Sequence, residues 1–153
     1  MEGQEKETRL PLEITPIANN YCFVCGKHNP KGLHLQVHYY PEALAAESET
    51  VLPREYQGWA GVIHGGILAT LLDELMAHAV WRFAGPGLTI SLEVRFHAPL
   101  KPEEPIRVRG VLTSLNGSRR TAEAEIVRVP DGQKIASAKS RFLLLPENRG
   151  AGA

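Results

Sequence analysis

The stretch that decides the fold spans residues 58–74 and reads Gly-Trp-Ala-Gly-Val-Ile-His-Gly-Gly-Ile-Leu-Ala-Thr-Leu-Leu-Asp-Glu. Its first half is glycine-rich, as in a turn, and from Gly65 onward the apolar residues recur at the helical period. One stripe holds Leu68, Leu71, Leu72, Leu75 and Ala79, with Met76 beside it. Gly85-Pro86-Gly87 ends the pattern. The sequence therefore predicts one long helix from Gly65 to about Phe83.

The start of this helix is suited to an oxyanion. The first amide groups of a helix have no partner within it, and the helix dipole favours negative charge there. Gly65 and Gly66 leave these donors uncovered, and Asp73 follows two turns later. Bare amide donors and a carboxylate base or nucleophile are what acyl transfer requires. Glu74 points about 100° away from Asp73 around the helix, so we expect it on the surface or in an ion pair.

The bulk composition is that of one globular domain in 153 residues, with 43% apolar and 22% charged residues. Seventeen basic and 17 acidic side chains cancel, so nothing in the net charge favours nucleic acid or an anionic membrane. No apolar run approaches the roughly 20 residues of a membrane span, and the N-terminus lacks the apolar core of a signal peptide. We expect a cytoplasmic protein with a flexible arm (1–16), one domain (17–146) and a disordered tail (147–153).

Six strands are expected around the helix. Alternating or β-prone residues predict strands at 33–39 and 43–52 before it, and at 88–98, 105–115, 120–129 and 134–145 after it. Asn116-Gly117 and Asp131-Gly132 are strong hairpin signals between the later runs. The order predicts an α+β domain: two strands, the helix, then a four-stranded antiparallel meander, with the sheet curling around the helix. One sheet leaves an open face, which favours pairing with a second copy.

Three motifs resemble one family. They are Gly61-x-x-His64-Gly65-Gly66 followed by Asp73, then Thr89-x-x-Leu92-x-Val94-x-Phe96-x-x-Pro99, and the lead-in Cys22-x-x-Cys25-Gly26-x-x-Asn29-Pro30-x-Gly32-Leu33. Over roughly residues 20–145 the chain resembles the hot-dog-fold acyl-CoA thioesterases, in the branch similar to phenylacetic-acid-degradation thioesterases. The resemblance implies an antiparallel sheet wrapped around a central helix, in a homodimer or homotetramer. It also implies hydrolysis of coenzyme A thioesters at the subunit boundary, without a metal or organic cofactor.

The helix geometry supports a shared site. Gly65 and Asp73 are eight residues apart, which is about 12 Å along a helix axis, so one thioester carbonyl cannot contact both groups of one chain. The expected roles follow the family. The Gly65 amide, with that of Gly66, polarises the thioester oxygen, and Asp73 of the facing chain attacks the carbonyl or activates water. Thr89 orients the water or Asp73, and His64 orients the loop or contacts the substrate.

Substrate contacts are expected around this centre. Many relatives carry a side-chain amide where this chain has Gly58, and Gln57 stands one residue earlier at a different spacing. Trp59 is a candidate for the acyl pocket, and Ser91 is the reserve hydroxyl on the strand face expected to carry Thr89. Arg119 and Arg120 follow a hairpin tip, where they either bind the phosphates of coenzyme A or form a solvated edge.

Two alternatives to hydrolysis stay open. A binding module that keeps the acyl-CoA pocket without turnover is favoured slightly by Gly58. An enoyl-thioester hydratase would need a histidine and an acid placed to move a proton at the α-carbon, and the sequence has no recognisable second histidine in that role. Cys22 and Cys25 form one Cys-x-x-Cys pair, for which loop packing is the expected role. A zinc site would need two more ligands, and a redox pair would need to follow a strand at a helix start.

Overall fold

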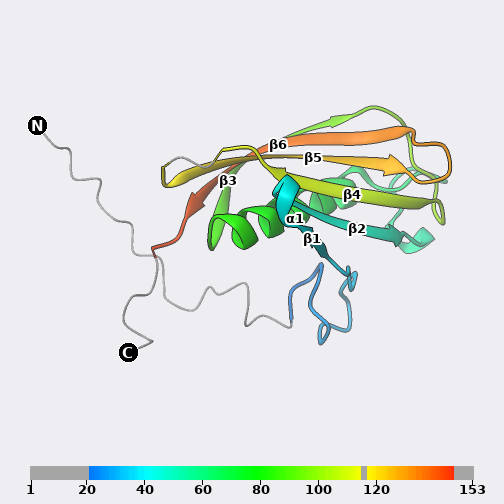
Figure 1. Ribbon diagram of the computed structural model, residues 1–153. Helices are drawn as coiled ribbons and strands as arrows, with labels where there is room; N and C mark the ends of the chain where they lie inside the picture. The colour runs from blue at the N-terminus through cyan, green and yellow to red at the C-terminus, as the bar shows by residue number, and fades with distance from the viewer. Residues whose placement is uncertain (1–20, 115–116, 147–153) are drawn as a thin grey trace, which may run out of the picture.

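The computed structural model describes residues 21–114 and 117–146 (Figure 1). Its regular elements are β1 (His38–Tyr40), β2 (Ala45–Val51), α1 (Gly65–Phe83), β3 (Gly87–Phe96), β4 (Pro105–Leu112), β5 (Arg119–Arg128) and β6 (Lys134–Leu144), with short 3-10 turns at Pro41–Ala43 and Arg54–Tyr56. The predicted helix is confirmed from its first residue to its last. The expected arm (1–16) and tail (147–153) lie outside the described residues.

The six strands form one antiparallel sheet in the order β1-β2-β4-β5-β6-β3, and Figure 1 shows it curving along α1. The expected hot-dog class, one sheet wrapped around one helix, is confirmed. The expected four-stranded meander was wrong for β3, which pairs with β6 instead of β4. Between β3 and β4 the chain passes the N-terminal end of α1. There the fully buried Leu100 accepts a hydrogen bond from the amide of Ile63, just before the helix. This crossing leaves β3 as an edge strand.

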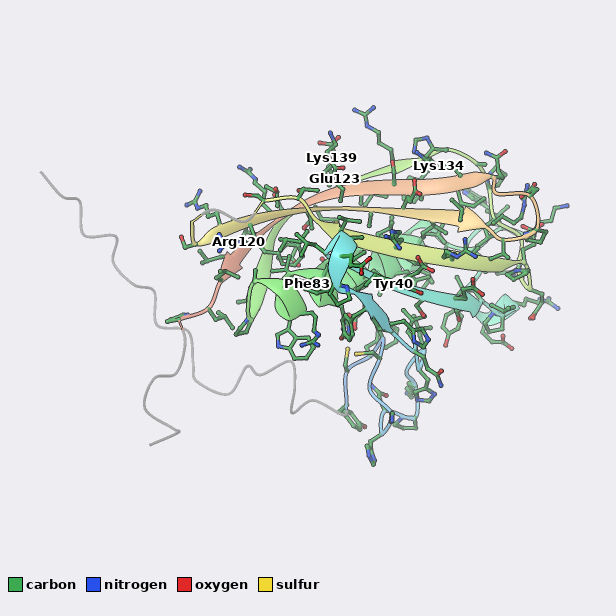
Figure 2. All side chains as sticks on the ribbon, in the orientation of Figure 1. Tyr40, Phe83, Arg120, Glu123, Lys134 and Lys139 are labelled. Carbon is green, nitrogen blue, oxygen red and sulfur yellow. The ribbon has the colours of Figure 1, made fainter. Side chains whose placement is uncertain are left out.

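The core lies between α1 and the concave face of the sheet. Every residue of the predicted helix stripe is buried, and facing it are the buried strand residues Val108, Ile126, Ile135 and Phe142. Gly110 in β4 allows the closest approach, because a Cβ there would lie 2.4 Å from the carbonyl carbon of Leu75. The opposite face of the sheet is charged, and Figure 2 shows Glu123, Lys134 and Lys139 on it.

The first predicted strand is mostly irregular. Only His38–Tyr40 joins the sheet, whereas the prediction began at Leu33. The amides of Leu33 and Leu35 bond to the carbonyls of Phe23 and Val24 in the preceding loop, and His34 has a left-handed φ of 52°. The alternation therefore reflects burial of Leu35 against α1 and its neighbours, without a strand ladder.

A bulge in β3 changes which side chains share a face. The β3–β6 register pairs Thr89 with Phe142 and Ser91 with Arg141, so Ile90 is the extra residue. Since paired residues point to the same side of a sheet, Thr89 lies on the helix side with the buried Phe142, and Ser91 lies on the outer side with the exposed Arg141. The expectation that Thr89 and Ser91 share a face was wrong, because it assumed strict alternation and the inserted residue shifts the alternation by one.

Among the helices that the structure describes, none combines the length and the apolar character that crossing a membrane requires.

Candidate active site

The first two amide groups of α1 differ in whether they have a hydrogen-bond partner. His64 is the N-cap in extended conformation (φ −60°, ψ 131°), and its Nδ1 accepts a hydrogen bond of 2.8 Å from the Gly66 amide. His64 thus holds the loop, which is one of the two roles expected for it. The Gly66 amide is engaged by this cap, so it is not a free donor as the sequence suggested.

The Gly65 amide is the uncovered donor. Within the described part of the chain, no group accepts a hydrogen bond from it. The Phe96 ring lies against Gly65, because a Cβ added to this glycine would stand 3.2 Å from the ring. A hollow of about 1000 Å³ opens here, lined among others by Trp59, Leu68 and Phe96. The helix start therefore presents one free N–H beside aromatic surface.

The loop before the helix supplies the rim of this hollow. Gln57 lines it, but its Oε1 accepts a hydrogen bond of 3.3 Å from the Gly61 amide and so holds the turn. A Cβ at Gly58 would lie 3.2 Å from the His64 ring, so a larger residue would require that ring to move by a few tenths of an ångström. Trp59 is 88% exposed, which is unusual for so large an apolar side chain. Trp59 is thus placed where an acyl pocket was expected.

Asp73 and Thr89 meet across the helix–strand contact. The Thr89 hydroxyl donates a hydrogen bond of 2.7 Å to Asp73 Oδ1. The bulge at Ile90 makes this contact possible, because it turns Thr89 toward α1. Asp73 is half-buried, and Thr89 is exposed in the isolated chain. The two residues that the sequence named separately therefore form one polar pair at the edge of the sheet.

The environment of Asp73 favours its protonated form. Burial raises the pKa of Asp73 above its usual range, the Thr89 hydrogen bond opposes this rise, and the charge of Glu74 adds to it. A carboxylate held near a higher pKa is a better proton acceptor than a free aspartate. Asp73 is thus equipped to act as a general base or as a nucleophile.

The other predicted contact residues are dispersed. Ser91 accepts a hydrogen bond from Arg141 on the outer face of the sheet, away from the helix-side pair. Arg119 and Arg120 pair with Leu143 and Phe142, so they point to opposite faces. Arg120, at the start of β5 in Figure 2, donates to the carbonyl of Gly117. The structure therefore does not bring the two arginines together as one anion site.

A second polar group lies on the neighbouring flank of α1 and was not predicted as a unit. Cys22 Sγ donates to Glu74 Oε1 over 3.7 Å, and the same oxygen lies 3.1 Å from His78 Nε2. Glu74, expected on the surface or in an ion pair, is thus half-buried with His78 as a side-chain partner. The sequence signal was the four-residue spacing of Glu74 and His78, which places them on one helix face.

The arrangement offers three elements of acyl transfer: a free amide donor at a helix start, a half-buried carboxylate with a raised pKa, and a hydroxyl that orients it. The donor and the carboxylate lie on the same helix, eight residues apart, so they are about 12 Å apart along its axis.

The thioesterase superfamily model matches residues 60–135, which span the helix, the His-Gly-Gly start and the Asp73–Thr89 pair. A solved thioesterase superfamily protein is 28% identical with a TM-score of 0.76; the match covers 81% of this chain and spans 60% of that protein's length. No curated protein matches the chain.

Two further structures share the fold. A mutant of the phenylacetic acid degradation protein PaaI from Thermus thermophilus is 24% identical with a TM-score of 0.66, covering 72% of this chain and 93% of that one. A hypothetical thioesterase from Streptococcus pneumoniae, solved with coenzyme A, is 16% identical with a TM-score of 0.66, covering 71% and 84%.

Proposed function

Because the chain belongs to the thioesterase superfamily of hot-dog proteins, we propose that it hydrolyses acyl-CoA thioesters to a free acid and coenzyme A at sites shared by two subunits. The observation that carries this proposal is the 2.7 Å hydrogen bond from Thr89 to Asp73. It gives a half-buried carboxylate a fixed direction next to a free strand edge. The uncovered Gly65 amide supplies the complementary donor.

The chemistry follows from these two groups. Asp73 accepts a proton from a water molecule whose oxygen adds to the thioester carbonyl carbon, and the Gly65 amide donates to the carbonyl oxygen as it becomes negative. Collapse of the adduct breaks the carbon–sulfur bond, and the proton passes from Asp73 to the departing thiolate. Direct attack by Asp73 gives the same products through an acyl-enzyme that water then hydrolyses. Both routes require Asp73 to be ionised.

Two observations support a site built from two chains. The axial distance of about 12 Å prevents one carbonyl from contacting both Gly65 and Asp73 of one helix. The edge strand β3 is ten residues long and leaves Ile90, Leu92 and Phe96 exposed by 48%, 40% and 57%. An apolar edge of this kind is a template for pairing with another strand. We expect β3 of two copies to pair, in a homodimer or in a homotetramer of two such pairs.

The substrate is expected to lie along this junction. The hollow beside Gly65 has Phe96 of the edge strand in its wall and Trp59 at its rim, so it suits an apolar or aromatic acyl group. Because the two side chains point to opposite faces, only one of Arg119 and Arg120 can contact a given coenzyme A phosphate. His64 and Gln57 act indirectly by holding the loop.

Thiol release from a panel of acyl-CoAs tests the reaction. We expect the wild-type chain to release coenzyme A. The acyl-CoA that gives the highest rate of release identifies the preferred acyl group. Binding of acyl-CoA without thiol release would replace the proposal with a binding module, and hydration of an enoyl-CoA would replace it with a hydratase.

Mixing two inactive variants tests the shared site. In a mixed dimer of Gly65→Pro and Asp73→Asn chains, one site has both intact residues and the other has neither. Random reassociation should restore about a quarter of the wild-type rate, since half of the dimers are mixed and one site in each is intact. No recovery in dimers shown to have exchanged subunits would place both groups in one chain and contradict the proposal.

A further inference from the structure

The loop before β1 brings two cysteines to the flank of α1 that carries Glu74 and His78. Sγ of Cys22, Sγ of Cys25 and a carboxylate oxygen of Glu74 all lie within 4.8 Å of one another. His78 Nε2 lies 3.1 Å from Oε1 of the same glutamate. We call Cys22, Cys25, Glu74 and His78 the Cys–Glu–His cluster, and we propose that it binds one structural Zn²⁺ ion.

The donor set suits zinc. Thiolate, carboxylate and neutral imidazole are all ligand types that zinc takes, four ligands complete its tetrahedron, and Cys-x-x-Cys is a typical spacing of paired zinc thiolates. Cys22 and Cys25 supplied only half of such a site in the sequence. The structure adds the other half from α1, which lies 52 residues away in the chain.

Two ligand–ligand distances of the cluster are close to the edges of a zinc tetrahedron. Zinc bond lengths give a sulfur–oxygen edge of about 3.6 Å and a nitrogen–oxygen edge of about 3.4 Å. Cys22 Sγ lies 3.7 Å from Glu74 Oε1, and His78 Nε2 lies 3.1 Å from that oxygen. The cluster surrounds a small hollow of about 140 Å³ that Trp81 and Gly87 also line. The two sulfur atoms and the carboxylate oxygen already lie within 4.8 Å of one another, so binding requires the imidazole to approach the sulfur atoms.

The surrounding groups hold the ligands as a metal site requires. The Tyr39 hydroxyl lies 2.7 Å from His78 Nδ1, so Nδ1–H can donate to it and leave Nε2 free for the ion. The Val24 amide donates to Cys22 Sγ over 3.4 Å, which fixes the position of this sulfur. Both cysteines are free thiols and half-buried.

Binding of the ion changes the protonation of the two cysteines. Two thiol protons leave to solvent, and the ion's two positive charges face two thiolates and one carboxylate. No electron transfer is involved. The ion would tie the loop before β1, blue in Figure 1, to the middle of α1, one residue beyond Asp73. Its role is therefore structural, and it is separate from the hydrolysis proposed above.

The test is metal content and cobalt spectroscopy on the full chain, which do not depend on catalysis. We expect about one zinc per chain in protein purified without chelator. The stripped, reduced chain titrated with Co²⁺ should show thiolate-to-metal charge transfer and the intense visible bands of tetrahedral cobalt. Chelation should lower the Tm by at least about 5 °C.

Variants separate a site from adventitious binding. Cys25→Ser and Glu74→Gln should lose most of the cobalt bands, and Tyr39→Phe should weaken zinc binding about 10–100-fold by releasing the imidazole. The exposed His28→Gln, close to Cys25 in sequence, is the matched control and should keep the full spectrum. Wild-type chain that retains no zinc and shows no tetrahedral cobalt bands would overturn the proposal, even if every variant failed to fold. Equal spectra for Glu74→Gln and wild type would also overturn it.

Discussion

Two neighbouring carboxylates on α1 have opposite environments. Asp73 faces the edge strand, where one hydroxyl contacts it, and burial raises its pKa. Glu74 faces the loop before β1; burial alone would raise its pKa, but hydrogen bonds from His78 and the two thiols lower it instead. The number of hydrogen-bond donors around each carboxylate therefore decides the direction of its pKa shift. Under the proposals above, Asp73 is the proton acceptor and Glu74 is a structural ligand.

The largest effect is expected at Asp73, the proposed proton acceptor. Asp73→Asn should lower kcat by about 10²–10⁴-fold, because the amide can neither accept the proton nor attack. The Thr89 hydroxyl can still donate to the amide oxygen, so the fold should persist. Thiol release from the best acyl-CoA measures the loss.

Glu74→Gln is the matched neighbour for that measurement. We expect its folded fraction to hydrolyse acyl-CoA far faster than Asp73→Asn. Equal losses in the two variants would mean that the two carboxylates do not differ in role.

The next effect tests the amide at the helix start. Gly65→Pro removes the N–H yet suits the first helical position, and His64 already has the extended backbone that precedes proline. Loss of one oxyanion donor should lower kcat about 10²–10³-fold. Steady-state kinetics on acyl-CoA provides the measurement.

Gly65→Ala separates the amide from steric effects. Both variants add a Cβ 3.2 Å from the Phe96 ring, but alanine keeps the N–H. Alanine as slow as proline would show that the ring contact matters and the amide does not.

A smaller effect concerns the hydroxyl that orients Asp73. Thr89→Val removes a hydrogen bond that lowers the Asp73 pKa, so that pKa should rise further. Activity requires ionised Asp73, so the acidic limb of the pH–rate profile should move to higher pH. At neutral pH, kcat/KM should fall about tenfold, as for one hydrogen bond to a charged group. Thr113→Val, which loses a contact with Thr121 elsewhere in the sheet, should leave the limb in place.

The smallest effect is on stability, with opposite signs for the two carboxylates. The pKa of folded Asp73 is raised, so its favourable contribution is complete below its unfolded pKa and is lost as pH rises through the folded value. Asp73→Asn should therefore stabilise the chain at neutral pH by about 0.5–2 kcal/mol. Glu74 has a lowered pKa, so its contribution is present at neutral pH and is lost on acidification.

Urea unfolding at fixed protein concentration, at neutral and mildly acidic pH, measures both changes. Glu74→Gln should destabilise the metal-free chain by about 1–3 kcal/mol at neutral pH. The same sign for both variants would remove the distinction between them.

Much of the fold and half of the site could be read from local pattern. The helix, its buried stripe and the later hairpins depend on hydrophobic periodicity and on turn residues. Both signals come from residues that are close together in the sequence. Gly65, Asp73 and Thr89 were found through motif spacing, and the pairing of Thr89 with Asp73 agrees with it. That these groups act on a thioester in two chains stays a prediction.

Other features depended on long-range contacts. The β3 edge position follows from the chain crossing at Leu100, and the bulge at Ile90 separates Thr89 from Ser91, so no alternation rule could reveal either. The joining of Cys22 and Cys25 to Glu74 required α1 and the first loop to pack together. The sequence by itself determined which elements form, because hydrophobic periodicity and turn formation depend on residues near one another in the chain. Only the tertiary structure decided which side chains meet, because burial brings together groups that the chain keeps far apart.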